Sequence, residues 1–202
     1  MKDNKKIVKE IRGWILSILA AFFIATVINS NVFAKAEVQQ NSMENTLFAT
    51  QQLIVDKISY NFIEPKRGDI VIFLEIGKKG TIADEALRTV GRVVSIFDNN
   101  DGSNESSRLI KRVIGVAGDE VDIKDGYVYI NGKKLEEAYV KGETISGEFK
   151  LPIKVGKNEL FVLGDNRIVS RDSREFGLID YKQLEGKAVY RVYPFNQIGK
   201  LK

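Results

Sequence analysis

A long uncharged run near the N-terminus is the first feature in the pattern of hydrophobic and polar positions. Residues 13–28 (GWILSILAAFFIATVI) carry no charge, and the uncharged stretch continues to residue 34. About 20 apolar residues are needed to cross the hydrocarbon core of a membrane as a helix. The pattern therefore predicts one transmembrane anchor over residues 13–34, with Trp14 and Phe33 near its two interfaces.

The charges around this run predict its orientation. The preceding residues carry Lys2, Lys5, Lys6, Lys9 and Arg12 against Asp3 and Glu10. Basic residues that flank a span stay in the cytoplasm. We therefore expect residues 1–12 to be a cytoplasmic tail and residues 35–202 to be the extracytoplasmic domain of a single-pass protein of the cell membrane.

A cleaved secretory signal is the alternative interpretation of the same N-terminal pattern. The basic start, the apolar run and the sequence Ala34-Lys35-Ala36 fit such a signal too. An uncleaved anchor is favoured because the run exceeds the roughly 7–15 apolar residues usual for a signal. The rest of the chain is exported under either interpretation.

Short β-branched runs between turn residues dominate the pattern beyond residue 51. The runs that predict strands are 52–58, 69–76, 88–97, 108–116 and 187–195. Within residues 120–135, Asp125-Gly126 and Asn131-Gly132 predict two hairpin turns, because they supply the positive-φ positions that tight turns require. The pattern predicts a mostly β domain of antiparallel, coiled or packed sheets.

Composition narrows the chemistry that this domain can perform. The 202 residues include no histidine and no cysteine, which excludes Ser-His-Asp and Cys-His catalysis, disulfides and the usual zinc sites. The formal net charge is +4, with basic residues spread along the chain, so nucleic-acid binding is not expected. We expect membrane lipid as a partner and no metal or small-molecule cofactor.

Three segments are rich in residues that could react: 39–52, 108–119 and 161–177. In the second, Lys111 and Arg112 are neighbours on a predicted strand, so one of them points toward whatever the sheet covers. A lysine in apolar surroundings has a lowered pKa, and its neutral amine can take the proton of an attacking serine. Explanations without catalysis stay open: Ser42 is then an ordinary loop serine, and the third segment is a solvated turn.

These segments together resemble the type I signal peptidases, which are membrane-bound Ser/Lys endopeptidases that remove signal peptides. The resemblance runs through NSMENTL (41–47), PKRGDIVIF (65–73), RLIKRVIGVAGD (108–119) and LGDNRIVSRDSREFG (163–177). The last two are the specific motifs. The single N-terminal anchor is similar to that of Gram-positive members.

The resemblance implies roles for particular residues. Ser42 is similar to the family nucleophile, Lys111 to the general base, and Ser170 to the serine that orients the lysine. Residues that hold the site together are implied at Asp172, Arg174, Asp165 and Arg167. A carboxylate close to Lys111 would raise the pKa of its amine, so we expect Asp172 to be engaged mainly by Arg174.

The resemblance also implies how the substrate binds. The end of a signal peptide on an exported precursor pairs in extended form with sheet edges, with small side chains at the first and third positions before the cut. Backbone pairing gives affinity, and shallow apolar pockets give selectivity. The candidate pocket walls are Met43, Leu47, Ile70, Val71, Ile72 and Ile110. Core packing is an equal alternative for each of them.

Three residues depart from the family pattern. Gln40 stands where members often carry a small hydroxyl residue that helps to bind the oxyanion, and Asn41 replaces a small residue. The oxyanion candidates are therefore the backbone N–H of Ser42 and the side chains of Gln40 and Asn41. Asn45 replaces the family proline. The chain between Phe73 and Arg108 is longer than in compact members, which suggests an inserted element at residues 77–107. These departures predict a narrower substrate set or lower activity.

Two other functions are compatible with the sequence. A weakly active or inactive assembly factor would keep the fold and bind exported surface subunits. A self-cleaving Ser/Lys regulator would need a sensor domain, and the N-terminal span occupies that place. The intact Ser42 and Lys111 favour the peptidase.

Overall fold

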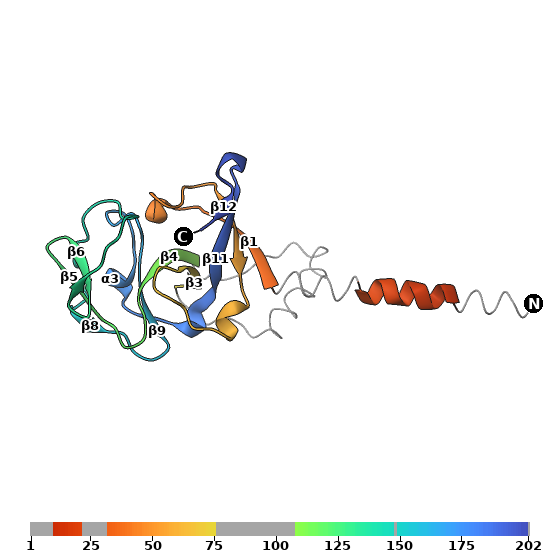
Figure 1. Ribbon diagram of the computed structural model, residues 1–202, viewed down its shortest axis with the longest axis horizontal. Coiled ribbons are helices and arrows are strands. Elements are labelled where there is room, and N and C mark those ends of the chain that lie inside the picture. The colour runs from red at the N-terminus through yellow and green to blue at the C-terminus, as the bar shows by residue number, and fades with distance from the viewer. Residues whose placement is uncertain (1–9, 22–31, 76–107, 148, 202) are drawn as a thin grey trace, which may run out of the picture.

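The computed structural model describes residues 10–21, 32–75, 108–147 and 149–201. Residues 10–21 form a helix, drawn in red in Figure 1. Within the described ranges, no helix is both long and apolar enough to cross a membrane. The predicted anchor also covers residues 22–31, which lie outside the described residues.

An eight-stranded antiparallel sheet forms the larger part of the domain (Figure 1). Along its hydrogen-bonded path the strands are β1 (Phe33–Glu37), β2 (Gln52–Asp56), β11 (Leu184–Tyr193), β3 (Ile70–Leu74), β4 (Arg108–Gly115), β9 (Glu159–Leu163) and β10 (Ile179–Asp180). The eighth strand, β12 (Gly199–Lys200), pairs with β11. Most of these runs are β-branched or aromatic, and such residues pack well on a pleated surface. The prediction of a mostly β, antiparallel domain is confirmed.

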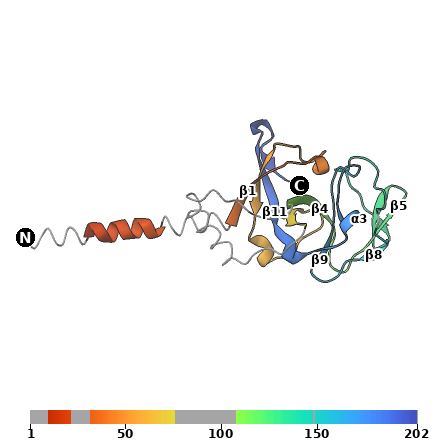
Figure 2. The ribbon, with the colours of Figure 1, turned by 180° about the vertical axis from the view of Figure 1, so that it is seen from behind.

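A smaller antiparallel sheet lies at the end of the domain opposite to β1, as Figure 2 shows from behind. Its order is β7 (Lys133–Lys134), β6 (Tyr127–Ile130), β5 (Glu120–Lys124) and β8 (Ile153–Lys154). Asp125 and Gly126 have φ of 50° and 81°, and Asn131 and Gly132 have φ of 52° and 77°. Positive φ at both central residues is what two-residue hairpin turns require, so both predicted turns are confirmed.

Separate apolar clusters join the two sheets and support the chain that precedes β2. The first contains Ile114, Phe161 and Leu163 of the large sheet against Val121, Ile123, Val128 and Ile130 of the small one. The second contains Val38, Met43, Leu47, Leu53, Ile70 and Ala188. Residues 38–47 are therefore anchored on the large sheet by their own side chains.

Short helical turns complete the described fold: η1 (Asn41–Met43), η2 (Ser59–Asn61), α3 (Ser173–Phe176), η3 (Tyr181–Gln183) and η4 (Phe195–Gln197). One predicted boundary differs from the structure. The sequence predicts Phe33 and Ala34 as the end of the anchor, but they begin β1, where they pair with Asp56 and Val55 of β2. The strand predicted over 88–97 and the element at 77–107 lie outside the described residues.

Gly115 ends β4 where the two sheets meet, and its position tests this packing. A Cβ there would lie 2.6 Å from Val121 Cγ2 and 3.2 Å from Phe161 Cβ. We expect Gly115→Ala to lower the free energy of unfolding by about 1–3 kcal/mol, because the added methyl overpacks the contact. Urea unfolding of the full chain in detergent measures this. Gly199→Ala is the control, since its Cβ would meet nothing within 4 Å, and an equal loss in both variants would contradict the prediction.

Candidate active site

Ser42 and Lys111 meet inside the domain although 69 positions separate them in the chain. Ser42 lies in η1 and is 4% exposed, while Lys111 lies in β4 and is 1% exposed. Lys111 Nζ donates to Ser42 Oγ at 2.9 Å and to the carbonyl oxygen of Ile110 at 3.0 Å. The fold thus brings the predicted nucleophile and the predicted base into direct contact.

Burial controls the charge of the Lys111 amine. Removal from water disfavours the ammonium form and lowers the pKa of Lys111 to about 8, against the opposing effect of the negative charges on Asp172 and Glu75. With that pKa, about one amine in ten is neutral at pH 7. A neutral amine has a lone pair that can accept the Ser42 hydroxyl proton.

Three buried arginine–carboxylate pairs hold the charged segment that follows β9. They are Asp172–Arg174, Asp165–Arg112 and Glu137–Arg167. Asp172 accepts from Arg174 through both of its oxygens, at 2.8 Å and 2.9 Å, as expected from the sequence. Asp165 likewise accepts twice from Arg112, at 2.8 Å and 2.7 Å. Two-point pairing neutralises these carboxylates and fixes the backbone that carries them.

Ser170, the predicted orienting serine, lies close to the nucleophile across Gly164. A Cβ on Gly164 would come within 2.2 Å of Ser170 Oγ and 2.5 Å of the Ser42 carbonyl oxygen, so the space admits only glycine. Ser170 Oγ is buried and has no hydrogen-bond partner among the described residues. Its action on Lys111 stays a prediction.

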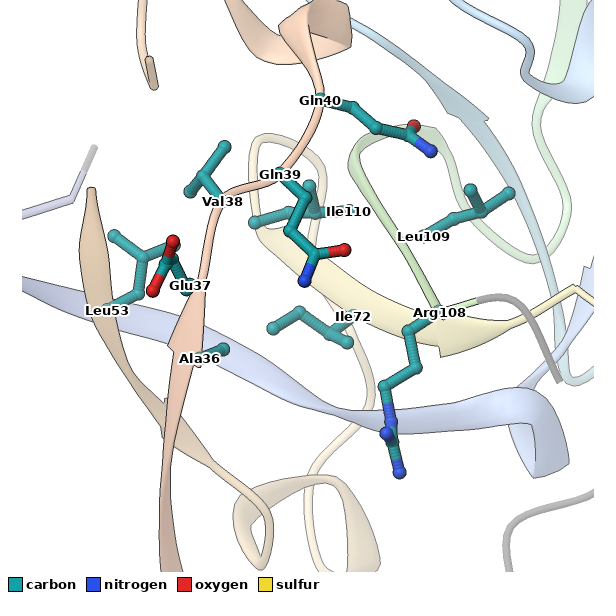
Figure 3. Close-up of a pocket in the computed structure, with 10 residues that line it drawn as sticks. All are labelled: Ala36, Glu37, Val38, Gln39, Gln40, Leu53, Ile72, Arg108, Leu109 and Ile110. Atoms are coloured by element: carbon teal, nitrogen blue, oxygen red, sulfur yellow. The ribbon is translucent and has the colours of Figure 1, made fainter. Parts of the chain in front are cut away.

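A groove of about 150 Å³ lies between the chain that precedes η1 and strand β4 (Figure 3). It is lined by Ala36, Glu37, Val38, Gln39, Gln40, Leu53, Ile72, Arg108, Leu109 and Ile110. One wall ends two residues before Ser42, and the opposite wall ends directly before Lys111. The groove is thus lined by the chain segments that run into Ser42 and Lys111, although neither of these side chains is among its lining residues.

The predicted pocket walls divide into two groups. Ile72 and Ile110 line the groove. Met43, Leu47 and Ile70 are core residues instead, buried in the cluster under residues 38–47. Neighbouring residues of a strand face opposite sides, so Val71 points to the other side of β3, where it is buried in a third apolar cluster with Phe73 and Val113. These four side chains are buried in the core and do not line this groove, and a role for them in binding substrate stays a prediction.

The three departures from the family pattern have different surroundings. Gln40 lines the groove, whereas Asn41 is exposed and its carbonyl oxygen accepts from Asn166 Nδ2 at 3.2 Å. Asn45 has φ of 91°, which proline cannot adopt because its ring fixes φ near −65°. The chain therefore turns differently here from one that carries proline. The role of Gln40 and Asn41 toward an oxyanion stays a prediction.

Several residues that complete the site were missed by the sequence analysis. Glu137 pairs with Arg167, Thr46 donates to Asp165, and Glu75 acts on the Lys111 amine. None of the three stands at a position that a local pattern distinguishes. Among the described residues, no group of three or more carboxylates is placed to hold a metal ion.

Comparison with known proteins decides the family. Residues 11–193 match the family model described as signal peptidase, peptidase S26. This chain belongs to the signal peptidase family. The resemblance inferred from the two specific motifs is therefore confirmed, together with the class of enzyme, a serine endopeptidase.

Individual members of the signal peptidase family match this chain, two of them along nearly its whole length. Signal peptidase I of Bacillus licheniformis is 34% identical over 207 aligned positions, which cover 98% of this chain and 95% of the relative. Signal peptidase IB of Staphylococcus aureus strain COL is 32% identical over 205 positions, which cover 94% and 93%. The crystal structure of a signal peptidase I from Enterococcus faecalis V583 is 28% identical with a TM-score of 0.43, and covers 62% of this chain and 97% of its own.

The lowered pKa of Lys111 predicts how activity depends on pH. We expect kcat/KM for cleavage of a precursor peptide to rise with pH, with its midpoint at about pH 8, because Lys111 must lose its proton to act as a base. Glu75→Gln removes a negative charge that raises this pKa, so the midpoint should move to lower pH. The exposed Glu136, changed to Gln, is the control. A flat profile, or a midpoint that Glu75→Gln leaves in place, would contradict the assignment.

Proposed function

We propose that this protein is a signal peptidase I that cleaves signal peptides from exported precursor proteins at the outer surface of the membrane. The observation that carries the proposal is the buried contact of 2.9 Å between Lys111 Nζ and Ser42 Oγ. The family and its signal peptidase I members give the class of reaction. An intact, buried pair also disfavours an inactive assembly factor.

Ser42 and Lys111 share the chemical steps. Ser42 Oγ attacks the carbonyl carbon of the scissile bond while the neutral Lys111 amine takes its proton. Lys111 then gives that proton to the leaving amine, and water attacks the resulting acyl-enzyme with Lys111 again as the base. The backbone N–H of Ser42 and the side chains of Gln40 and Asn41 are the donors proposed for the oxyanion.

Ser170 and the Asp172–Arg174 pair act on the base. A neutral amine still has hydrogens to donate, and a hydroxyl that accepts one of them aims the lone pair at Ser42. The buried Ser170 Oγ, with no partner among the described residues, is suited to this task. Arg174 engages both oxygens of Asp172, which limits the stabilisation that this carboxylate gives to a charged Lys111.

The groove beside the pair is the proposed site for the signal-peptide end. An extended segment along it would place its backbone between the chain at 36–40 and β4, with the scissile bond at Ser42. The volume of about 150 Å³ and the apolar Ile72 and Ile110 favour small side chains at the first and third positions before the cut. Small residues at these positions are the selectivity that the family resemblance implies.

Cleavage requires both reactive side chains in this proposal. Ser42→Ala and Lys111→Ala are each expected to lower kcat/KM by more than about 10³-fold, since one removes the nucleophile and the other its base. The measurement is conversion of a purified signal-peptide-bearing precursor to its mature form by the full chain in detergent. The exposed Lys150, changed to Ala, is the control. Processing at the wild-type rate by either variant would rule out the mechanism, and precursor binding without cleavage by the wild type would favour the assembly factor.

The same proposal places the domain outside the cell, held in the lipid by the apolar run that begins at residue 13 and ends before β1. Because the chain contains no cysteine, single cysteines can report the side of the membrane. In intact cells a membrane-impermeant maleimide should label Glu136→Cys but label Lys2→Cys only after the membrane is opened. Labelling of Lys2→Cys in intact cells would contradict this topology.

A further inference from the structure

Asn166 contacts the nucleophile's turn through both its backbone and its side chain. The backbone N–H of Asn166 donates to the Ser42 carbonyl oxygen at 3.0 Å. Its Nδ2 donates to the Asn41 carbonyl oxygen at 3.2 Å and to Glu44 Oε2 at 3.2 Å. The residue is 4% exposed, so these bonds are largely shielded from competition with water. One residue thus holds two consecutive carbonyl groups around the nucleophile.

The turn that carries Ser42 is weakly held by its own hydrogen bonds. η1 has three residues, and Gln40, at its N-terminal end, makes no side-chain capping bond. Its closing bond, from the Glu44 N–H to the Asn41 carbonyl oxygen, is 3.2 Å long. Asn45 then turns the chain with positive φ. So short a helical turn has little stability of its own, and the direction of the Ser42 side chain depends on contacts from outside.

Residues 139–141, called the strap here, hold Asn166 in place. The Lys141 N–H donates to the Asp165 carbonyl oxygen at 2.8 Å, and the Arg167 N–H donates to the Lys141 carbonyl oxygen at 3.0 Å. These two bonds enclose Asn166 between Asp165 and Arg167 in a parallel bridge with Lys141. The position of Asn166 is therefore set by backbone on both sides.

The strap also holds the nucleophile's turn directly. Lys141 Nζ donates to Glu44 Oε2 at 2.7 Å, the same oxygen that accepts from Asn166. Asn45 Nδ2 donates to the carbonyl oxygens of Tyr139 at 3.2 Å and Val140 at 3.4 Å. The turn, Asn166 and the strap form one connected set of hydrogen bonds.

We propose that Asn166 is a positioning residue for the nucleophile. Its side-chain amide, seated by the strap, fixes the Asn41 carbonyl and the Glu44 carboxylate, and thereby the direction of Ser42 Oγ toward Lys111 and the scissile carbonyl. The proposal rests on the proposed function. A misplaced nucleophile lowers the rate of attack while the groove, formed by other side chains, still binds the peptide.

The test compares variants that remove the amide but keep the backbone N–H. Asn166→Ala loses both side-chain bonds without adding charge. We expect kcat for a synthetic precursor peptide to fall about 10- to 100-fold, with KM within about twofold of the wild type. The kcat of Asn166→Asp should fall at least as far, because the new carboxylate would face the Glu44 carboxylate and the Asn41 carbonyl oxygen. Asn61→Ala, at an exposed asparagine in η2, is the matched control.

Glu44→Ala gives a second route to the same answer at a less buried position. It removes the acceptor shared by Asn166 and Lys141, so kcat should again fall while KM stays the same. The fall in kcat should be smaller than in Asn166→Ala. Three results would overturn the proposal. They are a rise in KM with unchanged kcat, an unchanged kcat in folded Asn166→Ala, and a loss of activity that is explained by a lowered Tm alone. If Asn166→Ala does not fold, unchanged kcat in Glu44→Ala would overturn it too. Cleavage by the wild-type protein, measured first, tests the proposed function separately.

Discussion

The removal of one amine from water is the constraint on which the rest of the site depends. A buried ammonium group is costly unless an opposite charge faces it, but such a charge would keep the amine protonated and useless as a base. Lys111 instead faces a hydroxyl and a carbonyl oxygen. The carboxylates of the neighbouring loop are each engaged by a guanidinium, as in Asp172–Arg174. The many charged residues of this loop therefore form ion pairs, which largely neutralise one another.

Features set by neighbouring residues could be predicted from the sequence, and features set by distant packing could not. Asp-Gly and Asn-Gly determine their hairpin turns within two residues, and the long β-branched runs at β3 and β4 needed no further context. Phe33 and Ala34 are uncharged, so they read as the end of an apolar span until β2 is available to pair with them. The sequence is equally compatible with Met43 as a pocket wall and as a core residue. Its burial in one cluster with Ile70 appears only in the structure.

The candidate site follows the same division. Ser42 and Lys111 stand in recognisable motifs, and the fold confirms that they touch. Glu137 lies 30 positions from Arg167, in a segment with no motif of its own, so its pairing appears only in three dimensions. Asn45 departs from the family proline, and the structure supplies a physical account of the change. Proline restricts a turn through its ring, whereas Asn45 takes a positive φ and restricts the turn through side-chain bonds to the strap.

β1 continues without a break into the wall of the groove, and the nucleophile follows at Ser42. For a chain held in lipid by its N-terminal apolar run, this segment is also a spacer between the bilayer and the reactive hydroxyl. The spacer includes a strand paired along its length with β2, so its reach is close to 3.3 Å per residue and does not vary like that of a loose linker. The separation between the start of β1 and the nucleophile is thereby set by strand pairing and not by a flexible linker.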